Sequence, residues 1–296
     1  MHIPVLLEIV IEYLNPRPDE NFVDCTIGEA GHAKAILEDT KPNGRVLGID
    51  LDLQSLKRIK SKIVEHELGE RLILTHGNFK DLKKIVKENH FKSINGILFD
   101  LGLSSWQIEK SKRGFSFKKD EALKMTFHGQ DLTAIDIINS WPEQALTEIF
   151  KKYGEEKYSW KIAKGIIKER KIRPIKTTFQ LLETIKKTVP YSKTRRGQIS
   201  RVAARIFQAL RITVNDELEN LRQGLRQSLE ILEPGGRLVV ISFHSLEDRI
   251  VKNFFKQGKE DKFLEVLTKK PITAGEEEVK NNSRSRSAKL RAAFKL

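Results

Sequence analysis

The stretch from Phe22 to Asp52 limits the fold of this chain more than any other. A short apolar run, Phe22 to Cys25, leads into a glycine-bearing turn, and a helical pattern begins at His32. A second apolar run follows and ends in Asp50. Glycines let a backbone turn tightly, and the start of a helix offers unpaired N–H groups to a ligand. The stretch therefore predicts the front half of a doubly wound α/β nucleotide-binding sheet.

The turn lacks the usual signatures of a pyrophosphate site. Its only glycines are Gly28 and Gly31, and neither G-x-G-x-x-G nor G-x-x-x-x-G-K-[ST] is present. The carboxylate of Glu29 would repel phosphate, so a neutral or cationic nucleoside fits better, and S-adenosyl-L-methionine (AdoMet) is the common one. Asp50 follows the turn by about 20 residues, where a carboxylate accepts both hydroxyls of a ribose. The alternative is an ordinary βαβ unit whose strand ends in an acidic residue.

Composition indicates a polar-surfaced globular chain. The 296 residues are 39% hydrophobic and 32% charged, and they include one cysteine. No apolar run approaches the roughly 20 residues of a membrane span, and the first residues lack a basic start and a cleavage site. A single cysteine excludes an internal disulfide framework and fits a reducing cytosol. We therefore expect a cytoplasmic protein without a membrane segment or signal peptide.

The net charge of +14 suggests a polyanionic partner, and most of it lies in the middle of the chain. Between Lys110 and Arg196 there are 21 Lys/Arg and 10 Asp/Glu, whereas the rest of the chain carries 33 and 30. Aromatic residues are interleaved there, as in surfaces that bind unpaired RNA bases. They are Trp141, Tyr153, Tyr158, Trp160 and Tyr191. The alternatives are a solvated basic face and an ordinary aromatic core.

Apolar runs and turn residues predict seven strands, with a long interruption after the fourth. The expected strands are Phe22–Cys25, Arg45–Asp50, Arg71–Thr75, Ile94–Asp100, Arg237–Phe243, Phe263–Thr268 and Ala288–Phe294. Helical patterns lie at 5–14, 32–38, 53–68, 81–89, 206–212, 215–232 and 245–255, and in the interruption at 134–138, 143–152, 158–169 and 178–188. Residues 276–287 are expected to form a loop.

This layout is that of a class I AdoMet-dependent methyltransferase, a Rossmann-like seven-stranded sheet with an inserted, mostly helical domain after strand four. We expect the methyltransferase domain at 1–112 and 204–296, and the insert at 113–203. Ligands of such sheets lie beyond the carboxyl ends of the strands. Asp24 would either cap the turn or meet the amino group of the cofactor, and Phe79 would stack on or flank the adenine.

Methylation of an exocyclic amine makes a specific demand, because the nitrogen lone pair is delocalised into the ring. Acceptors that take the N–H bonds favour the nucleophilic form and orient it. Asp100, Ser104 and Ser105 follow the fourth strand and are candidates for this role, although the serines are equally good helix caps. His244, after strand five, is a further candidate, with a structural hydrogen-bonding role as its alternative. Cys25 is interpreted as a buried small residue, and the His and Cys spacing predicts no metal site.

Several stretches resemble one known family, and together they span nearly the whole chain. They are His2–Glu8, Asp24–Gly28 with Gly31-His32, Asp100–Gln107 with Arg113–Phe117, Phe207–Ile212 with Val214–Leu218, Gly235–Leu238, Ser242–Arg249 and Ser285–Arg291. The chain resembles the bacterial ribosomal RNA small subunit methyltransferase H family, also called MraW.

The resemblance implies AdoMet-dependent methylation of N4 of a cytosine in the decoding centre of 16S rRNA, within an assembled or nearly assembled small ribosomal subunit. It also implies RNA recognition by the insert and a cofactor site whose residues are Ala30, Gly31, His32, Asp50, Phe79, Asp100 and Gln107. A membrane partner and a metal are not expected, and a homodimer is left open. Other readings are a nucleic-acid amino-methyltransferase with a different target and a non-catalytic ribosome-assembly factor on the same scaffold.

The chain departs from the family pattern in three places. The family's cofactor loop is usually richer in glycine, and here Glu29 and Ala30 stand at two of those positions. The stretches 123–127 and 200–205 also differ from the usual sequences. The first departure bears on cofactor affinity. The other two bear on details of the substrate face and not on the reaction class.

Overall fold

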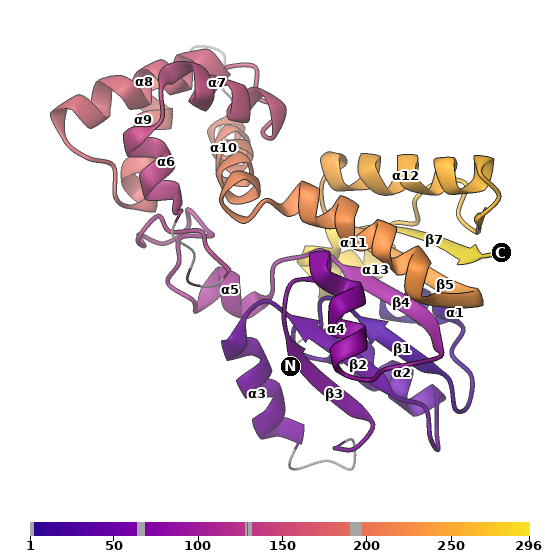
Figure 1. Ribbon diagram of the computed structural model, residues 1–296. Helices are drawn as coiled ribbons and strands as arrows, with labels where there is room; N and C mark the ends of the chain where they lie inside the picture. The colour runs from indigo at the N-terminus through magenta and orange to yellow at the C-terminus, as the bar shows by residue number, and fades with distance from the viewer. Residues whose placement is uncertain (1–2, 64–68, 128, 130–131, 190–196) are drawn as a thin grey trace. The chain divides into compact units, whose positions relative to one another are not determined.

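The computed structural model describes residues 3–63, 69–127, 129, 132–189 and 197–296 (Figure 1). The chain forms two compact units, one made of Met1–Gly102 and Leu218–Leu296 and the other of Leu103–Glu217. The insert expected at 113–203 lies inside the second unit, which extends further at both ends. One reason is that α10 (Gln198–Asn215) supplies buried side chains to the core of the second unit.

A seven-stranded sheet in the order β3-β2-β1-β4-β5-β7-β6 forms the centre of the first unit. Its strands are β1 Asn21–Asp24, β2 Val46–Asp50, β3 Leu72–His76, β4 Ile94–Asp100, β5 Leu232–Ser242, β6 Leu264–Val266 and β7 Lys289–Lys295. Strands β1 to β5 pair in parallel, and β7 pairs antiparallel with both β5 and β6. The expected class I methyltransferase fold is confirmed. Strand β5 begins earlier than expected, because Leu232 pairs with Ile94 ahead of an irregularity in the register.

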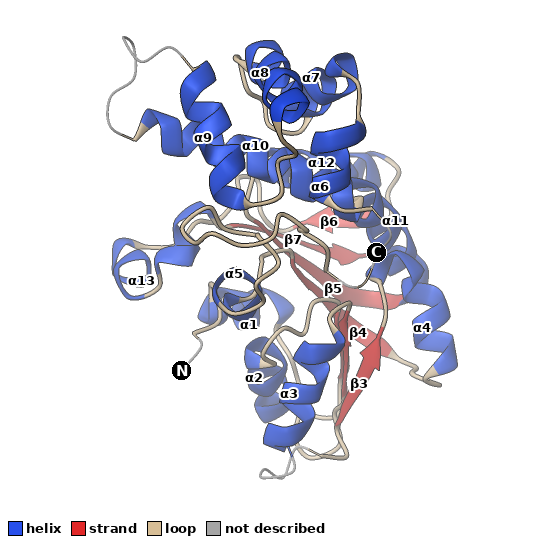
Figure 2. Cartoon of the chain, turned by 90° about the vertical axis from the view of Figure 1, so that its left-hand side faces the viewer, coloured by secondary structure: helices blue, strands red, loops and turns tan. Residues whose placement is uncertain are grey.

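Helices cover both faces of this sheet (Figure 2). The helices α1 (Leu7–Leu14), α2 (Gly31–Asp39) and α3 (Leu53–Ile63) bury apolar side chains against one face. The helices α4 (Leu82–Glu88), α11 (Glu217–Ile231) and α12 (Ser245–Glu260) do so against the other. The last part of the helix expected over 53–68, residues 64–68, lies outside the described residues.

The segment 276–287, expected as a loop, is instead α13 (Glu276–Asn281) followed by a 3₁₀ turn at Ser283–Ser287. That prediction was wrong because the segment is held by contacts distant in sequence. The Leu6 N–H donates to Glu278 Oε1 at 2.7 Å, and Asn282 Nδ2 donates to the carbonyl of Ile3 at 3.1 Å. A segment poor in apolar residues is thus ordered by hydrogen bonds to the N-terminal segment.

The second unit is helical, as expected, and has a core of its own. Besides α10 its helices are α5 (Ser105–Glu109), α6 (Ala134–Ser140), α7 (Glu143–Lys152), α8 (Ser159–Ile172) and α9 (Thr178–Thr188). Apolar side chains from α6 to α10 meet in one buried cluster. Its described part contains no strand, only an isolated bridge between Ala122 and Thr177. Among the described helices of the whole chain, none is both long and apolar enough to cross a bilayer.

Candidate cofactor site at the strand ends

Three neighbouring parallel strands of the first unit each end in an aspartate. These are Asp24 on β1, Asp50 on β2 and Asp100 on β4. In the register, Asp24 pairs with Gly48 on one side and with Leu98 on the other. Asp50 therefore lies two residues beyond Gly48, and Asp100 lies two residues beyond Leu98. Since side chains alternate between faces with a period of two, all three carboxylates project on the face that carries α2.

The turn after β1 takes backbone conformations that favour glycine. Gly28 has φ +52° and Ala30, the N-cap of α2, has φ +61°. Only Gly28 is a residue that adopts this region without steric cost, so Ala30 is held there by its surroundings. The Ser55 hydroxyl donates to the Gly28 carbonyl at 2.5 Å and ties the turn to α3. A Cβ on Gly31 would lie 2.3 Å from Pro4 Cγ, so the N-terminal segment packs directly on the first residue of α2.

His32, one residue into α2, lies beside the end of β4. Its Nε2 is 3.6 Å from Asp100 Oδ2, and the imidazole is only 6% exposed. Among the residues that the structure describes, neither ring nitrogen has a hydrogen-bond partner, and the same holds for Asp100 Oδ1. The Asp100 N–H donates to Thr26 Oγ1 at 2.7 Å, which links the end of β4 to the turn after β1. Buried polar atoms without partners are uncommon in folded proteins, so these three atoms indicate a polar ligand.

Burial raises the pKa of two of the carboxyls. The pKa of Asp24 rises to about 7, chiefly by desolvation and further through the negative charges of Asp100 and Asp50, while His32 and a hydrogen bond from the Thr26 N–H act against the rise. The pKa of Asp50 rises to about 6 by burial, opposed by a hydrogen bond from the Asp52 N–H at 2.8 Å. The site thus holds acidic groups that titrate near neutrality, which is typical of ligand-binding clefts.

Phe79 follows β3 and begins a 3₁₀ turn. Its ring packs edge-on against Phe99, with centroids 5.4 Å apart, and is part of the core cluster on the face that carries α4 and α11. The ring is only partly buried. The proposed contact with adenine therefore depends on the exposed part of the ring and stays a prediction.

Three of the expected site residues, Ser104, Ser105 and Gln107, belong to the second unit. Ser104 is the N-cap of α5 and forms a capping box with Gln107: the Gln107 N–H donates to Ser104 Oγ at 3.2 Å, and the Ser104 N–H donates to Gln107 Oε1 at 2.9 Å. The helix-cap alternative therefore describes what Ser104 does in this structure. Ser105 is the first residue of α5, and its side chain lies outside the described part of the structure.

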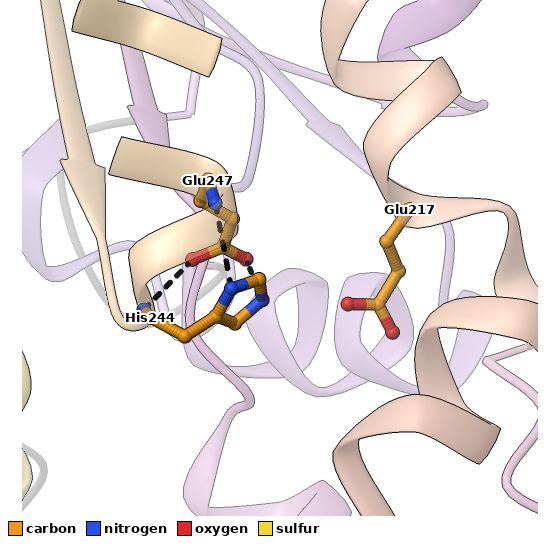
Figure 3. Close-up of side chains that lie close together, drawn as sticks. All are labelled: Glu217, His244 and Glu247. Carbon is orange, nitrogen blue, oxygen red and sulfur yellow. Dashed lines mark hydrogen bonds and ion pairs between the residues drawn. The ribbon is translucent and has the colours of Figure 1, made fainter. Parts of the chain in front are cut away.

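His244 caps α12 and forms a capping box with Glu247 (Figure 3). The Glu247 N–H donates to His244 Nδ1 at 3.4 Å, and the Phe243 N–H donates to Glu247 Oε2 at 2.8 Å. His244 Nε2 is also 3.1 Å from Glu247 Oε1. The helix begins at Ser245, as expected, with a histidine as its N-cap. These contacts give His244 a structural task, as its alternative interpretation held.

Figure 3 also labels Glu217, the last residue of the second unit. Its carboxylate accepts two hydrogen bonds from the Arg211 guanidinium, at 2.8 and 2.7 Å. His244, Glu247 and Glu217 all carry atoms of the kind that bind metal ions. The carboxylates of Glu247 and Glu217 already accept hydrogen bonds in the cap and from Arg211, whereas His244 Nε2 has no hydrogen-bond partner among the described residues. We assign no metal to them.

Cys25 and the aromatic residues of the second unit behave largely as core residues. Burial raises the pKa of the Cys25 thiol well above its ordinary value, which suits an inert small residue and not a nucleophile. Three of the five aromatic residues pack against the core cluster of the second unit, namely Trp141, Tyr153 and Tyr158. Tyr191 lies outside the described residues.

Trp160 is different, because half of its surface is exposed. Its indole ring carries Lys164 above it, with Nζ 5.0 Å from the ring centroid. Along the same helix, Lys161 and Lys168 are exposed as well. An exposed aromatic ring among lysines is a surface on which bases and phosphates both find partners.

Comparison with known proteins decides the family. A sequence model of the MraW methylase family matches residues 1–296. The chain belongs to this family. Relatives named ribosomal RNA small subunit methyltransferase H include one from Sulfurihydrogenibium sp., 46% identical over 296 residues, which cover 100% of this chain and 99% of the relative. Another, from Carboxydothermus hydrogenoformans, is 43% identical over 312 residues, covering 100% of this chain and 98% of the relative.

Among solved structures, a candidate rRNA methylase from Clostridium thermocellum aligns over 100% of both chains. It has a TM-score of 0.50 and 14% sequence identity, a likeness that speaks for the fold alone. Within the MraW methylase family, this chain thus keeps the expected sheet, and the residues that follow its strands can be interpreted on that scaffold.

Three residues that contact the turn after β1 or link it to β4 were missed by sequence reasoning. Thr26 accepts from the Asp100 N–H, Ser55 donates to Gly28, and Pro4 packs on Gly31. Thr26 lies two residues after Asp24, within the predicted turn, so its position could have identified it as a polar turn residue. Ser55 and Pro4 are distant in sequence from the groups they touch, and no local pattern indicates either contact.

Proposed function

We propose that this protein is an AdoMet-dependent methyltransferase that modifies N4 of a cytosine in the decoding centre of 16S rRNA, on an assembled or nearly assembled small ribosomal subunit. The observation that carries the proposal is the cluster of Asp24, Asp50 and Asp100 at adjacent strand ends, with unpartnered polar atoms on His32 and Asp100. Full-length relatives named for rRNA small subunit methylation support the choice of substrate.

The residues at the strand ends fit AdoMet, which supplies an electrophilic methyl group when bound. Asp50 would accept the ribose hydroxyls, as the acidic residue after a second strand does in this class of sheet. The turn at Gly28, Ala30 and Gly31 lets the ligand approach the backbone closely. The buried carboxyl of Asp24 is suited to the cationic part of the cofactor, because a cation nearby favours its ionised form.

Asp100 is the residue we assign to the target amine. Its Oδ1 is buried and accepts no hydrogen bond from any described residue, while Oδ2 faces His32. An acceptor fixed in this way can take an N–H of the amine, orient its lone pair and stabilise the positive charge that grows on nitrogen during transfer. Ser104 and Gln107 hold each other in the cap of α5, which leaves Asp100 as the better-supported acceptor.

The second unit would bind RNA. The segment 110–196 has an excess of eleven positive charges, and α8 presents Trp160 among exposed lysines. Phosphate contacts from lysine supply affinity, whereas an exposed ring stacks on an unpaired base. The cytoplasm, where small subunits are assembled, would be the place of action.

The test is methyl transfer from labelled AdoMet to small ribosomal subunits that lack the modification, with nucleoside analysis of the product. We expect N4-methylcytidine at one position. A different methylated nucleoside would replace the target and favour another amino-methyltransferase. AdoMet binding without transfer to any small-subunit preparation, from bare rRNA to complete subunits, would favour a non-catalytic assembly factor.

A further inference from the structure

The three strand-end carboxyls make the cofactor site acidic. Asp24 is buried and Asp50 is partly buried, and Asp100 lies on the same face two residues beyond the Leu98 that pairs with Asp24. From α2 the imidazole of His32 faces them, with Nε2 3.6 Å from Asp100 Oδ2. The Cys25 thiol, next to Asp24, is neutral because burial raises its pKa.

A site of this charge discriminates between ligands that differ in charge alone. AdoMet carries a sulfonium, and after methyl transfer the remaining S-adenosylhomocysteine is a neutral thioether with the same adenosine and the same amino-acid group. Hydrogen bonds to ribose or to the backbone therefore treat the two nearly alike. Carboxylates in a poorly solvated site bind the cationic ligand more tightly, because charge–charge attraction grows as the effective dielectric falls.

We propose that Asp24, acting with Asp50 and Asp100, makes the cofactor site select the cationic sulfonium over its neutral thioether product, and that the strength of this selection depends on whether Asp24 is ionised. The inference rests on the proposed function, in that it takes AdoMet as the cofactor. It adds a role for Asp24 in releasing the product after each turnover.

The location of Asp24 makes it the member of the trio that changes charge. It lies on the middle strand of the three, between the other two carboxylates, and is only 1% exposed. Both neighbouring charges oppose its ionisation. A cation that enters the site reverses this balance and drives the proton off Asp24, so cation binding and proton release are linked.

The sign of the linkage follows from the two end states. In the empty protein Asp24 is largely protonated below pH 7, since its pKa is about 7. In the complex with a cation it is ionised to lower pH. Cation affinity therefore rises with pH, by at most about tenfold per pH unit for one linked proton, and levels off above pH 7. S-adenosylhomocysteine lacks the sulfonium and should show a weaker dependence.

The experiment is calorimetric titration of the full-length protein with AdoMet and with S-adenosylhomocysteine between pH 5.5 and 8.5, in pairs of buffers that differ in ionisation enthalpy. We expect the affinity ratio of AdoMet to S-adenosylhomocysteine to rise about threefold to tenfold between pH 6 and 7.5, with more protons released on AdoMet binding. Equal proton release for both ligands in the unmodified protein would overturn the inference without any variant.

Asp24→Asn keeps an acceptor for the Thr26 N–H and removes the titrating group. We expect its affinity ratio to be lower and to rise less between pH 6 and pH 7.5 than that of the unmodified protein, because Asp50 still titrates near pH 6. The matched control is Asp39→Asn, an equal change at the exposed far end of α2. It should behave as the unmodified protein, and any titration of the ligands themselves appears in both variants. A ratio that rises with pH as steeply in Asp24→Asn as in the unmodified protein would also overturn the inference.

These outcomes separate the inference from the proposed function. Binding of both ligands with a constant ratio would refute charge selection and leave the cofactor assignment in place. Failure of the unmodified protein to bind either ligand at any pH would remove the cofactor assignment, and the inference with it.

Discussion

At the scale of single residues, the site depends on what each carboxylate contacts. Asp50 accepts a hydrogen bond from the Asp52 N–H at 2.8 Å and is partly buried at the end of β2. We expect Asp50→Ala to weaken AdoMet binding by about 1–3 kcal/mol, the cost of leaving a pair of ribose hydroxyls unmatched. Calorimetric titration measures it, with Asp39→Asn as control. Affinity equal to that of the unmodified protein would refute the ribose assignment.

Asp24 also affects stability. Its pKa rises from 3.8 in the unfolded chain to about 7 in the fold, so the folded state binds the proton more tightly. The stabilisation is complete below pH 4 and is lost as pH rises through 7. We expect the difference in free energy of unfolding between Asp24→Asn and the unmodified protein to shift in favour of the variant by on the order of 2 kcal/mol from pH 5 to pH 8. Urea unfolding at both pH values measures the gain. Parallel pH profiles for the two proteins would contradict it.

At the scale of elements, α2 is capped by a residue with an unfavourable backbone conformation, in the turn that we propose contacts the cofactor. Ala30 has φ +61°, where an L-residue with a Cβ is strained by about 1–2 kcal/mol. We expect Ala30→Gly to raise the free energy of unfolding by up to about 1 kcal/mol, once the loss of a buried methyl is included. Thermal and urea unfolding provide the measurement.

The control for this change is Ala33→Gly, in the same helix and equally buried, at a residue without positive φ. It should lower stability by about 1 kcal/mol, since glycine weakens a helix interior. An equal decrease in the free energy of unfolding for both substitutions would show that Ala30 is not strained.

The helices and strands also show how much of the fold could be predicted from the sequence alone. The alternation of apolar runs with helical patterns was sufficient for all seven strands, and Ile94–Asp100 has the bounds expected. The cluster of aspartates followed from the rule that strand ends meet at one edge. The start of α12 at Ser245 was predicted, whereas its cap could not be foreseen, because histidine is not a usual N-cap residue. The order in 276–287 could not be foreseen, since it depends on Ile3 and Leu6.

At the scale of the whole molecule, the charge distribution predicts how RNA binding responds to salt. Lys161, Lys164 and Lys168 are exposed on α8. We expect their joint change to glutamine to weaken binding to small-subunit rRNA and to reduce the slope of log affinity against log salt by about 2, since each phosphate contact contributes about 0.7. Filter binding at several salt concentrations measures the slope.

The control is the same triple change at three exposed lysines on α12, Lys252, Lys256 and Lys259. It removes an equal charge from the other unit and should leave the slope nearly unchanged. Equal losses from both triple variants would mean that binding follows net charge and not a surface of the second unit.

The place of β7 has a consequence for how the protein is made. This strand, Lys289–Lys295, lies between β5 and β6 although it follows both along the chain. While the ribosome is still adding residues beyond Val266, β5 exposes an edge with unpaired backbone groups, which is prone to join other chains. The sheet is complete only when the residues of β7 have emerged. The first unit can therefore complete its folding only late in translation. Premature termination would leave an aggregation-prone fragment that chaperones bind or proteases degrade.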